Sequence, residues 1–161
     1  MNAGEVRHWV FRAHVLDRAG ALTSIASAFS NRGISIQTVV GHGAEEQATH
    51  DGTVVMTFKC SERDKDMMVR VVKRLNKVTR LEEHPYDSHK LRKSAVIHTT
   101  RRLSPSDVAG ETTFLTCELM TEEPTGYDYF LAGAPSELDP VLRRIESAGI
   151  VTDIVYTVMG L

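Results

Sequence analysis

The sequence predicts an α+β protein of two successive modules, and three features of the chain support this prediction. Segments in which apolar residues alternate, as in strands, are interspersed with segments in which they recur every three or four positions, as in helices. Glycines stand where two of these helices are expected to end, at Gly33 and Gly149. The polar stretch 85–92, PYDSHKLR, separates the two series and has the composition of a linker.

The first module is expected to begin with a strand at residues 7–17, followed by a helix that ends at Gly33. One face of the strand is apolar and consists of Trp9, Phe11, Ala13 and Val15. The helix carries an apolar stripe at spacings i, i+3, i+4 and i+7, which consists of Leu22, Ile25, Ala26 and Phe29.

The remainder of the first module alternates in the same way. Strands are expected at 34–42 and 53–60, on either side of a polar loop. A helix over 62–76 has Ser61 as a suitable N-cap, and a strand at 78–84 closes the module. The inward stripe of that helix is expected to be Met68, Val71, Val72 and Leu75. The order β-α-β-β-α-β is the ferredoxin-like plan, with two helices on one face of a four-stranded antiparallel sheet.

The second module is expected to be ferredoxin-like as well, but without a clear first helix. Its strands are predicted at residues 94–100, 112–120, 127–132 and 151–158. A helix at 135–148, with Ser136 as its expected N-cap, has an inward face of Leu138, Val141, Leu142 and Ile145. Residues 101–111 contain Pro105 and Gly110, so we expect only a turn or a single helical turn there. The predicted domains are 1–86 and 93–161, joined by a linker at 87–92.

Composition excludes several classes of function. The formal net charge of −2 provides no positive field for nucleic acid. No apolar run approaches the roughly 20 residues that span a bilayer. The first residues, MNAGEVRHW, lack the apolar core of a signal peptide, so we expect a cytoplasmic location. Cys60 and Cys117 are expected to be small core residues.

We expect no catalytic site, metal or cofactor. Ser24, Ser27 and the two cysteines have no general base at a recognisable spacing. Pairs of glutamates, such as Glu45-Glu46, are adjacent in sequence, and neighbours on a strand point to opposite faces. The seven histidines do not have the spacings of a preformed metal site.

Residues 17–36, DRAGALTSIASAFSNRGISI, carry the clearest indication of a binding site. They place a helix N-terminus at the end of a strand, after the small-residue turn Ala19-Gly20. The first backbone N–H groups of a helix have no partner within the helix, so they can bind a carboxylate. A small acidic metabolite such as an amino acid is therefore a plausible ligand.

The same stretch resembles the ligand loop and first helix of an ACT domain, a small regulatory module that binds amino acids. Residues 73–83, KRLNKVTRLEE, are similar to the regulatory small subunit of acetolactate synthase. The resemblance is strong as far as Glu83 and weak beyond Arg92.

This resemblance implies a non-catalytic regulatory subunit that forms a homodimer and binds a branched-chain amino acid at the dimer interface. It implies a partner as well, the large thiamine-dependent catalytic subunit. Carried over by position, the effector loop consists of Asp17, Ala19, Gly20, Ala21 and Leu22. Ser35 and Ile36 would approach from the second strand of the neighbouring subunit.

Three positions depart from the family pattern, which has Asn at Asp17, Pro at Ala19 and Asn at Ser35. A carboxylate at Asp17 is unfavourable near the carboxylate of a ligand unless it meets the ammonium group instead. Ser35 offers a hydroxyl in place of an amide. A stand-alone ACT-type sensor of a small molecule or a metal, without a synthase partner, is therefore the alternative.

Overall fold

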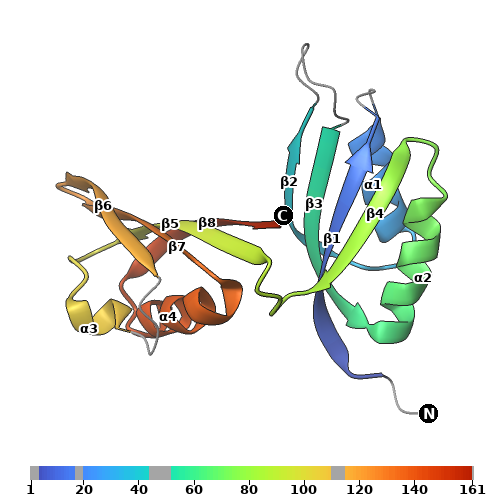
Figure 1. Ribbon diagram of the computed structural model, residues 1–161. Helices are drawn as coiled ribbons and strands as arrows, with labels where there is room; N and C mark the ends of the chain where they lie inside the picture. The colour runs from blue at the N-terminus through green and yellow to red at the C-terminus, as the bar shows by residue number, and fades with distance from the viewer. Residues whose placement is uncertain (1–3, 17–19, 44–51, 110–114, 161) are drawn as a thin grey trace. The chain divides into compact units, whose positions relative to one another are not determined.

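The computed structural model describes residues 4–16, 20–43, 52–109 and 115–160 (Figure 1). The chain divides into two compact units, and the division lies between Ser88 and His89. The prediction that both units follow the ferredoxin-like plan is confirmed, since each contains a four-stranded sheet with helices on it. The domain limits at 86 and 93 stay a prediction.

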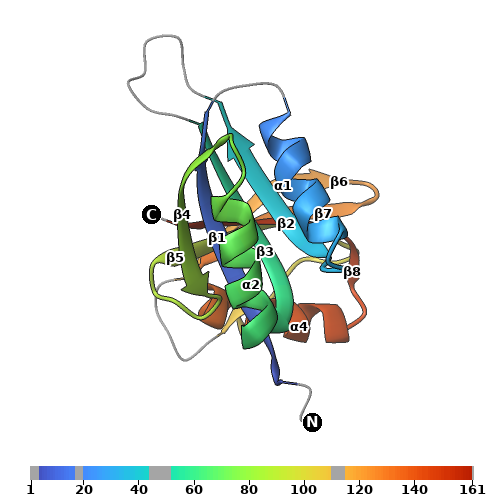
Figure 2. The same cartoon turned by 90° about the vertical axis from the view of Figure 1, so that its right-hand side faces the viewer.

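The first unit has the predicted order β-α-β-β-α-β. Its elements are β1 (Val6–Val15), α1 (Ala21–Ser30), β2 (Ile36–His42), β3 (Gly52–Ser61), α2 (Glu62–Lys73) and β4 (Val78–Pro85). The sheet order is β2-β3-β1-β4, with antiparallel pairing between neighbours. Both helices lie on one face of this sheet, as Figure 2 shows. Ser61 caps α2 as predicted, since its hydroxyl accepts a hydrogen bond from the Asp64 amide at 3.1 Å.

The core of the first unit lies between the sheet and its two helices. The predicted apolar face of β1 is buried there, together with Met68 and Val72 from α2. Three aromatic rings from β1, α1 and β3 meet edge to face at its centre. Phe58 lies 4.7 Å from Phe11 and 4.8 Å from Phe29 between ring centroids. This geometry is the one that aromatic quadrupoles favour.

The predicted stripe of α1 was wrong at two positions. The helix buries Ala21, Ile25, Ala28 and Phe29. Leu22 is 49% exposed, and Ala26 is exposed as well. Two stripes overlap on this short helix, because small alanines occur on both sides of Ile25 and Phe29. Alanine allows the closer approach of helix and sheet. The side with Ala21 and Ala28 therefore faces inward, and the side with Leu22 and Ala26 faces outward.

The second unit repeats the plan with a reduced first helix. Its elements are β5 (Leu91–Thr99), α3 (Pro105–Val108), β6 (Thr116–Glu123), β7 (Gly126–Gly133), α4 (Pro135–Ser147) and β8 (Val151–Gly160). The sheet order is β6-β7-β5-β8. The single helical turn predicted within 101–111 is α3, whereas residues 110–114 lie outside the described part of the chain. The predicted inward face of α4 is buried.

Several details of the second unit differ from prediction, among them β6, which runs from Thr116 to Glu123 rather than over 112–120. β5 begins at Leu91 rather than at 94, because the alternation of buried residues starts at that fully buried leucine. Ala134 is the N-cap of α4 and Pro135 its first residue, so Ser136 does not cap it. The first residue of a helix needs no amide hydrogen for the helical hydrogen bonds, so proline fits there and Ala134, rather than Ser136, precedes the helix. Cys117 is exposed rather than in the core, as all of β6 is.

In the described residues, no helix is long and apolar enough to cross a membrane.

A histidine–aspartate pair joins β5 to β7. His98 Nδ1 lies 2.6 Å from Asp128 Oδ1, and His98 Nε2 lies 3.3 Å from the Thr125 carbonyl oxygen. Both ring nitrogens therefore face acceptors, and only the imidazolium can donate to both. The hydrogen bond to Asp128, with a smaller effect of Thr125, raises the pKa of His98 above its usual 6.5. Hydrogen bonds from Thr121 and His98 lower the pKa of Asp128 below its usual 3.8.

The pair predicts a pH window of added stability. The stability that His98 contributes is complete below pH 6.5 and is lost as the pH rises through its raised pKa. The stability that Asp128 contributes is present above pH 3.8 and is lost as the pH falls through its lowered pKa. His98→Gln should therefore destabilise the protein more between these values than at higher pH. Denaturation across pH checks this, with the exposed His89→Gln as control. Titration of His98 at or below 6.5 by NMR would contradict it.

Candidate functional site

The predicted effector loop lies at the end of the first unit where β1 ends and α1 begins. Gly20 is the N-cap of α1 and has φ 87° and ψ 0°, a left-handed conformation. Its carbonyl accepts the first helical hydrogen bond from the Ser24 amide at 2.9 Å, and the Ser24 hydroxyl donates to the same oxygen at 2.9 Å. Glycine adopts this conformation without the steric cost that other residues have. The local sequence therefore determines how the helix starts.

Among the described residues, the N-termini of α1 and α4 have no side-chain cap, unlike those of α2 and α3. No side chain of the described residues caps α1, and its first turn contains no acidic residue. In contrast, α2 has Ser61 and Asp64 at its start, and α3 has a capping box of Ser104 and Asp107. Uncapped amides at a helix N-terminus, together with the helix dipole, favour a bound anion.

Lys77 adds a positive charge beside this helix start. A Cβ atom placed on Gly20 would lie 2.8 Å from Lys77 Nζ. The backbone holds the lysine there, because the Lys77 carbonyl accepts a hydrogen bond from the Leu16 amide at 2.9 Å. Helix amides and an ammonium group on adjacent elements form a suitable pair of donors for a carboxylate.

Sequence reasoning missed Lys77, although a signal for it existed. In the order β-α-β-β-α-β, the turn that follows the second helix lies at the same end of the sheet as the turn that follows the first strand (Figure 2). Any cation in that turn is thus a candidate neighbour of the effector loop.

The structure places the other predicted loop residues in different environments. Asp17 and Ala19 lie outside the described residues. Ala21 is buried against the core, so only its backbone can contact a ligand. Leu22 is exposed next to the helix N-terminus, where its apolar side chain can contact an aliphatic ligand.

Ser35 and Ile36 lie near the other end of α1. They line a hollow of about 400 Å³ together with Phe29, Ser30 and Gly33. Because α1 has ten residues, it separates them from Gly20 by roughly 15 Å at 1.5 Å per residue. One chain therefore does not bring the two predicted groups together. A site that contains both requires a second copy.

The described residues offer little for catalysis or metal binding. No three side chains of the His, Cys, Asp and Glu types gather there to hold a metal. Burial raises the pKa of the Cys60 thiol to about 11, which makes the reactive thiolate scarce near neutral pH. The Ser24 hydroxyl donates to a backbone carbonyl rather than to a base.

Comparison with known proteins identifies the fold. No protein-family model and no curated protein matches the sequence. Among solved structures, the small subunit of acetolactate synthase from Thermotoga maritima is similar to this chain with a TM-score of 0.63, 14% identity and 98% of each chain covered. The chain therefore has the fold of that small subunit, with two ferredoxin-like modules in succession. The predicted resemblance to that small subunit is confirmed at this level.

Two aspartate kinase structures match less well. The regulatory subunit from Thermus thermophilus, in its ligand-free form, aligns with 13% identity and a TM-score of 0.48, over 89% of this chain and 95% of its own. The enzyme from Clostridium acetobutylicum aligns with 13% identity and a TM-score of 0.47, over 90% of this chain and 33% of its own. These scores are too low to support a conclusion.

The left-handed start of α1 predicts a cost for any side chain at that position. Gly20→Ala should lower the free energy of unfolding by about 1–2 kcal/mol, because a Cβ is strained in this conformation. Gly33→Ala is a matched control for strain alone, since Gly33 has φ 68° with nothing within 4 Å of its Cβ position. Urea denaturation of both variants tests this. If Gly20→Ala were as stable as the unchanged protein, this result would contradict the left-handed conformation of Gly20.

Proposed function

We propose that this protein is a non-catalytic regulatory subunit that binds an amino acid and thereby modulates a biosynthetic enzyme. The observation that carries the proposal is the uncapped N-terminus of α1 beside Lys77. The proposed enzyme is acetolactate synthase of branched-chain amino acid synthesis. The fold similarity to a small subunit of that enzyme, over both modules, supports this choice.

The ligand is proposed to bind through its carboxylate first. That group would accept hydrogen bonds from the first amides of α1 and pair with the Lys77 ammonium. An aliphatic side chain would contact the exposed Leu22 and the partly buried Ile36 of a second copy. This arrangement favours a branched-chain amino acid over a charged one.

The regulatory effect would arise through linkage. An effector that binds between two copies stabilises one arrangement of the pair, and a catalytic subunit that prefers one arrangement responds to this shift. Coupling free energies of this kind are typically about 1–3 kcal/mol. β2 is an edge strand of its sheet and is therefore available for side-by-side pairing of two copies.

Two experiments test the proposal together. A calorimetric screen of the twenty amino acids against the purified chain identifies the effector. Co-purification with a large thiamine-dependent subunit, followed by activity measurement with and without this chain, identifies the target. Binding of an amino acid with no response from the large subunit would favour the stand-alone sensor. Absence of binding to any amino acid would overturn the effector site.

Lys77→Gln should weaken binding of the identified amino acid by about tenfold. The variant removes one charge-assisted hydrogen bond, worth roughly 1.5–3 kcal/mol. Lys73→Gln is the matched control, because Lys73 is an exposed lysine at the end of α2. Calorimetry on both variants provides the comparison. Equal affinities for the two would mean that Lys77 does not contact the ligand.

Asp17→Asn should strengthen amino-acid binding, because it removes a carboxylate that repels the carboxylate of the ligand. The change also restores the residue that the family has at this position. Titration calorimetry at low and high salt should show a gain that shrinks as salt screens the charge. Weaker binding would instead assign Asp17 to the ammonium group of the ligand.

A further inference from the structure

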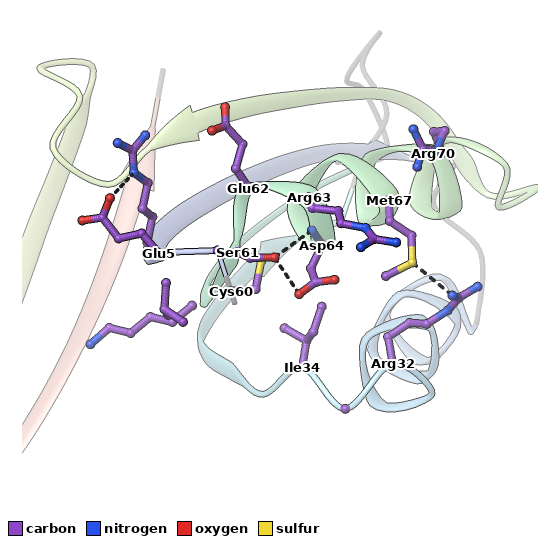
Figure 3. A pocket seen from close by; sticks show the side chains of 15 residues that line it. Glu5, Arg32, Ile34, Cys60, Ser61, Glu62, Arg63, Asp64, Met67 and Arg70 are labelled. Atoms are coloured by element: carbon purple, nitrogen blue, oxygen red, sulfur yellow. Dashed lines mark hydrogen bonds and ion pairs between the residues drawn. The ribbon is translucent and has the colours of Figure 1, made fainter. Parts of the chain in front are cut away.

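A second hollow of the first unit lies at the end of the sheet opposite the effector loop. It has a volume of about 980 Å³ and is bounded by the start of β1, the turn after α1 and the first turns of α2 (Figure 3). We call it the arginine hollow after Arg32, Arg63 and Arg70, which line it. The ten residues of β1 separate the two ends by roughly 30 Å at 3.3 Å per residue.

The three arginines line the same hollow as Met67, and one of them contacts it. Arg63, Met67 and Arg70 follow each other on α2 at spacings of four and three, so they lie on one face of the helix. Arg32, from the turn after α1, donates to Met67 Sδ at 3.1 Å through its Nη1 group. Figure 3 shows the side chains of Arg32 and Arg63 on either side of Met67. Two separate elements therefore bring three guanidinium groups to one place.

These arginines have no acidic partner within ion-pair distance among the described residues. Some basic side chains elsewhere are paired, such as Arg101 with Asp107 at 2.8 Å and Lys65 with Glu83 at 3.2 Å, whereas others, such as Arg143, are in no ion pair among the described residues. Near Arg32, Arg63 and Arg70 no such pair is formed in the parts of the chain that the structure describes. Their mutual repulsion thus remains uncompensated by the protein.

Three acids also line the arginine hollow, and two of them interact with other residues of its lining rather than with Arg32, Arg63 or Arg70. Asp64 Oδ2 accepts a hydrogen bond from the Ser61 hydroxyl at 2.7 Å within the cap of α2. Glu5 pairs with Arg7 at 3.8 Å. Glu62 points away from Arg32 and Met67 in Figure 3. The positive charges of the guanidinium groups beside Met67 are therefore available to a ligand.

We propose that the arginine hollow binds a small polyanion with two adjacent phosphate or carboxylate groups. Guanidinium groups bind such oxyanions through paired hydrogen bonds, and one polyanion can bridge several of them. Met67 between the arginines provides an apolar surface for the carbon atoms of an organic anion. The proposal does not rest on the amino-acid site, because none of the three arginines belongs to that site. Gly33 and Ile34 line both this hollow and the one beside Ser35 and Ile36.

Inorganic pyrophosphate is the probe that tests this inference. Calorimetry on the full chain should show saturable binding that weakens as salt increases. Arg63→Gln combined with Arg70→Gln should weaken it by about tenfold or more, since two charge-assisted interactions are lost. Arg63→Lys with Arg70→Lys keeps the charge but not the forked donors, and should have an intermediate effect. All the substituted side chains are exposed, so the variants should fold.

The control is Arg143→Gln, which removes the same type of charge from an exposed position of α4 in the second unit. It should leave pyrophosphate binding within twofold of the unchanged protein. Equal weakening by Arg143→Gln, or no saturable binding at all, would overturn the proposal. So would binding of an acidic peptide with no binding of pyrophosphate, since that result assigns the hollow to a partner protein. Amino-acid binding is measured in the same variants and should not change, which keeps the two sites distinguishable.

Discussion

The edge-to-face contact of Phe11, Phe29 and Phe58 is the interaction on which the first unit depends. It joins α1 to the two central strands, with centroid distances of 4.7 and 4.8 Å from Phe58 to the other two rings. Since Phe29 lies one residue before the end of α1, the contact fixes the position of the whole helix on the sheet. The helix N-terminus at Gly20 and the turn at Arg32 are thereby set at opposite ends of the unit.

Opposite ends of one helix layer thus have different chemistry. At Gly20 no side chain of the described residues caps the helix amides, and Lys77 stands beside them. This combination suits one carboxylate. Around Met67 there are side-chain guanidinium groups on longer and more adaptable stems, which suits a larger and more highly charged anion.

The second unit shows how much of the plan the fold can lose. A single turn, α3, stands in the place of the first helix, and α4 alone supplies a long apolar face to the core. Every residue of β6 is exposed. The His98–Asp128 pair joins β5 to β7, the two central strands of this sheet, near the turn that leads from β6. It adds a polar contact next to the buried side chains of Ile97 and Tyr129.

Local periodicity determined the order of elements, and the glycines that end helices were predictable for the same reason. Gly33 and Gly149 have φ values of 68° and 71°, the left-handed conformation that ends α1 and α4 before the next strand. Only the tertiary structure decided that Ala21 and Ala28 of α1 face inward with Leu22 outside, because the periodicity allows either stripe and packing selects between them. It also decided that Lys77 lies beside Gly20 and that Arg32 meets Met67. Such pairs are far apart in sequence, and a pattern with a period of two or of 3.6 residues carries no information about distances across a fold.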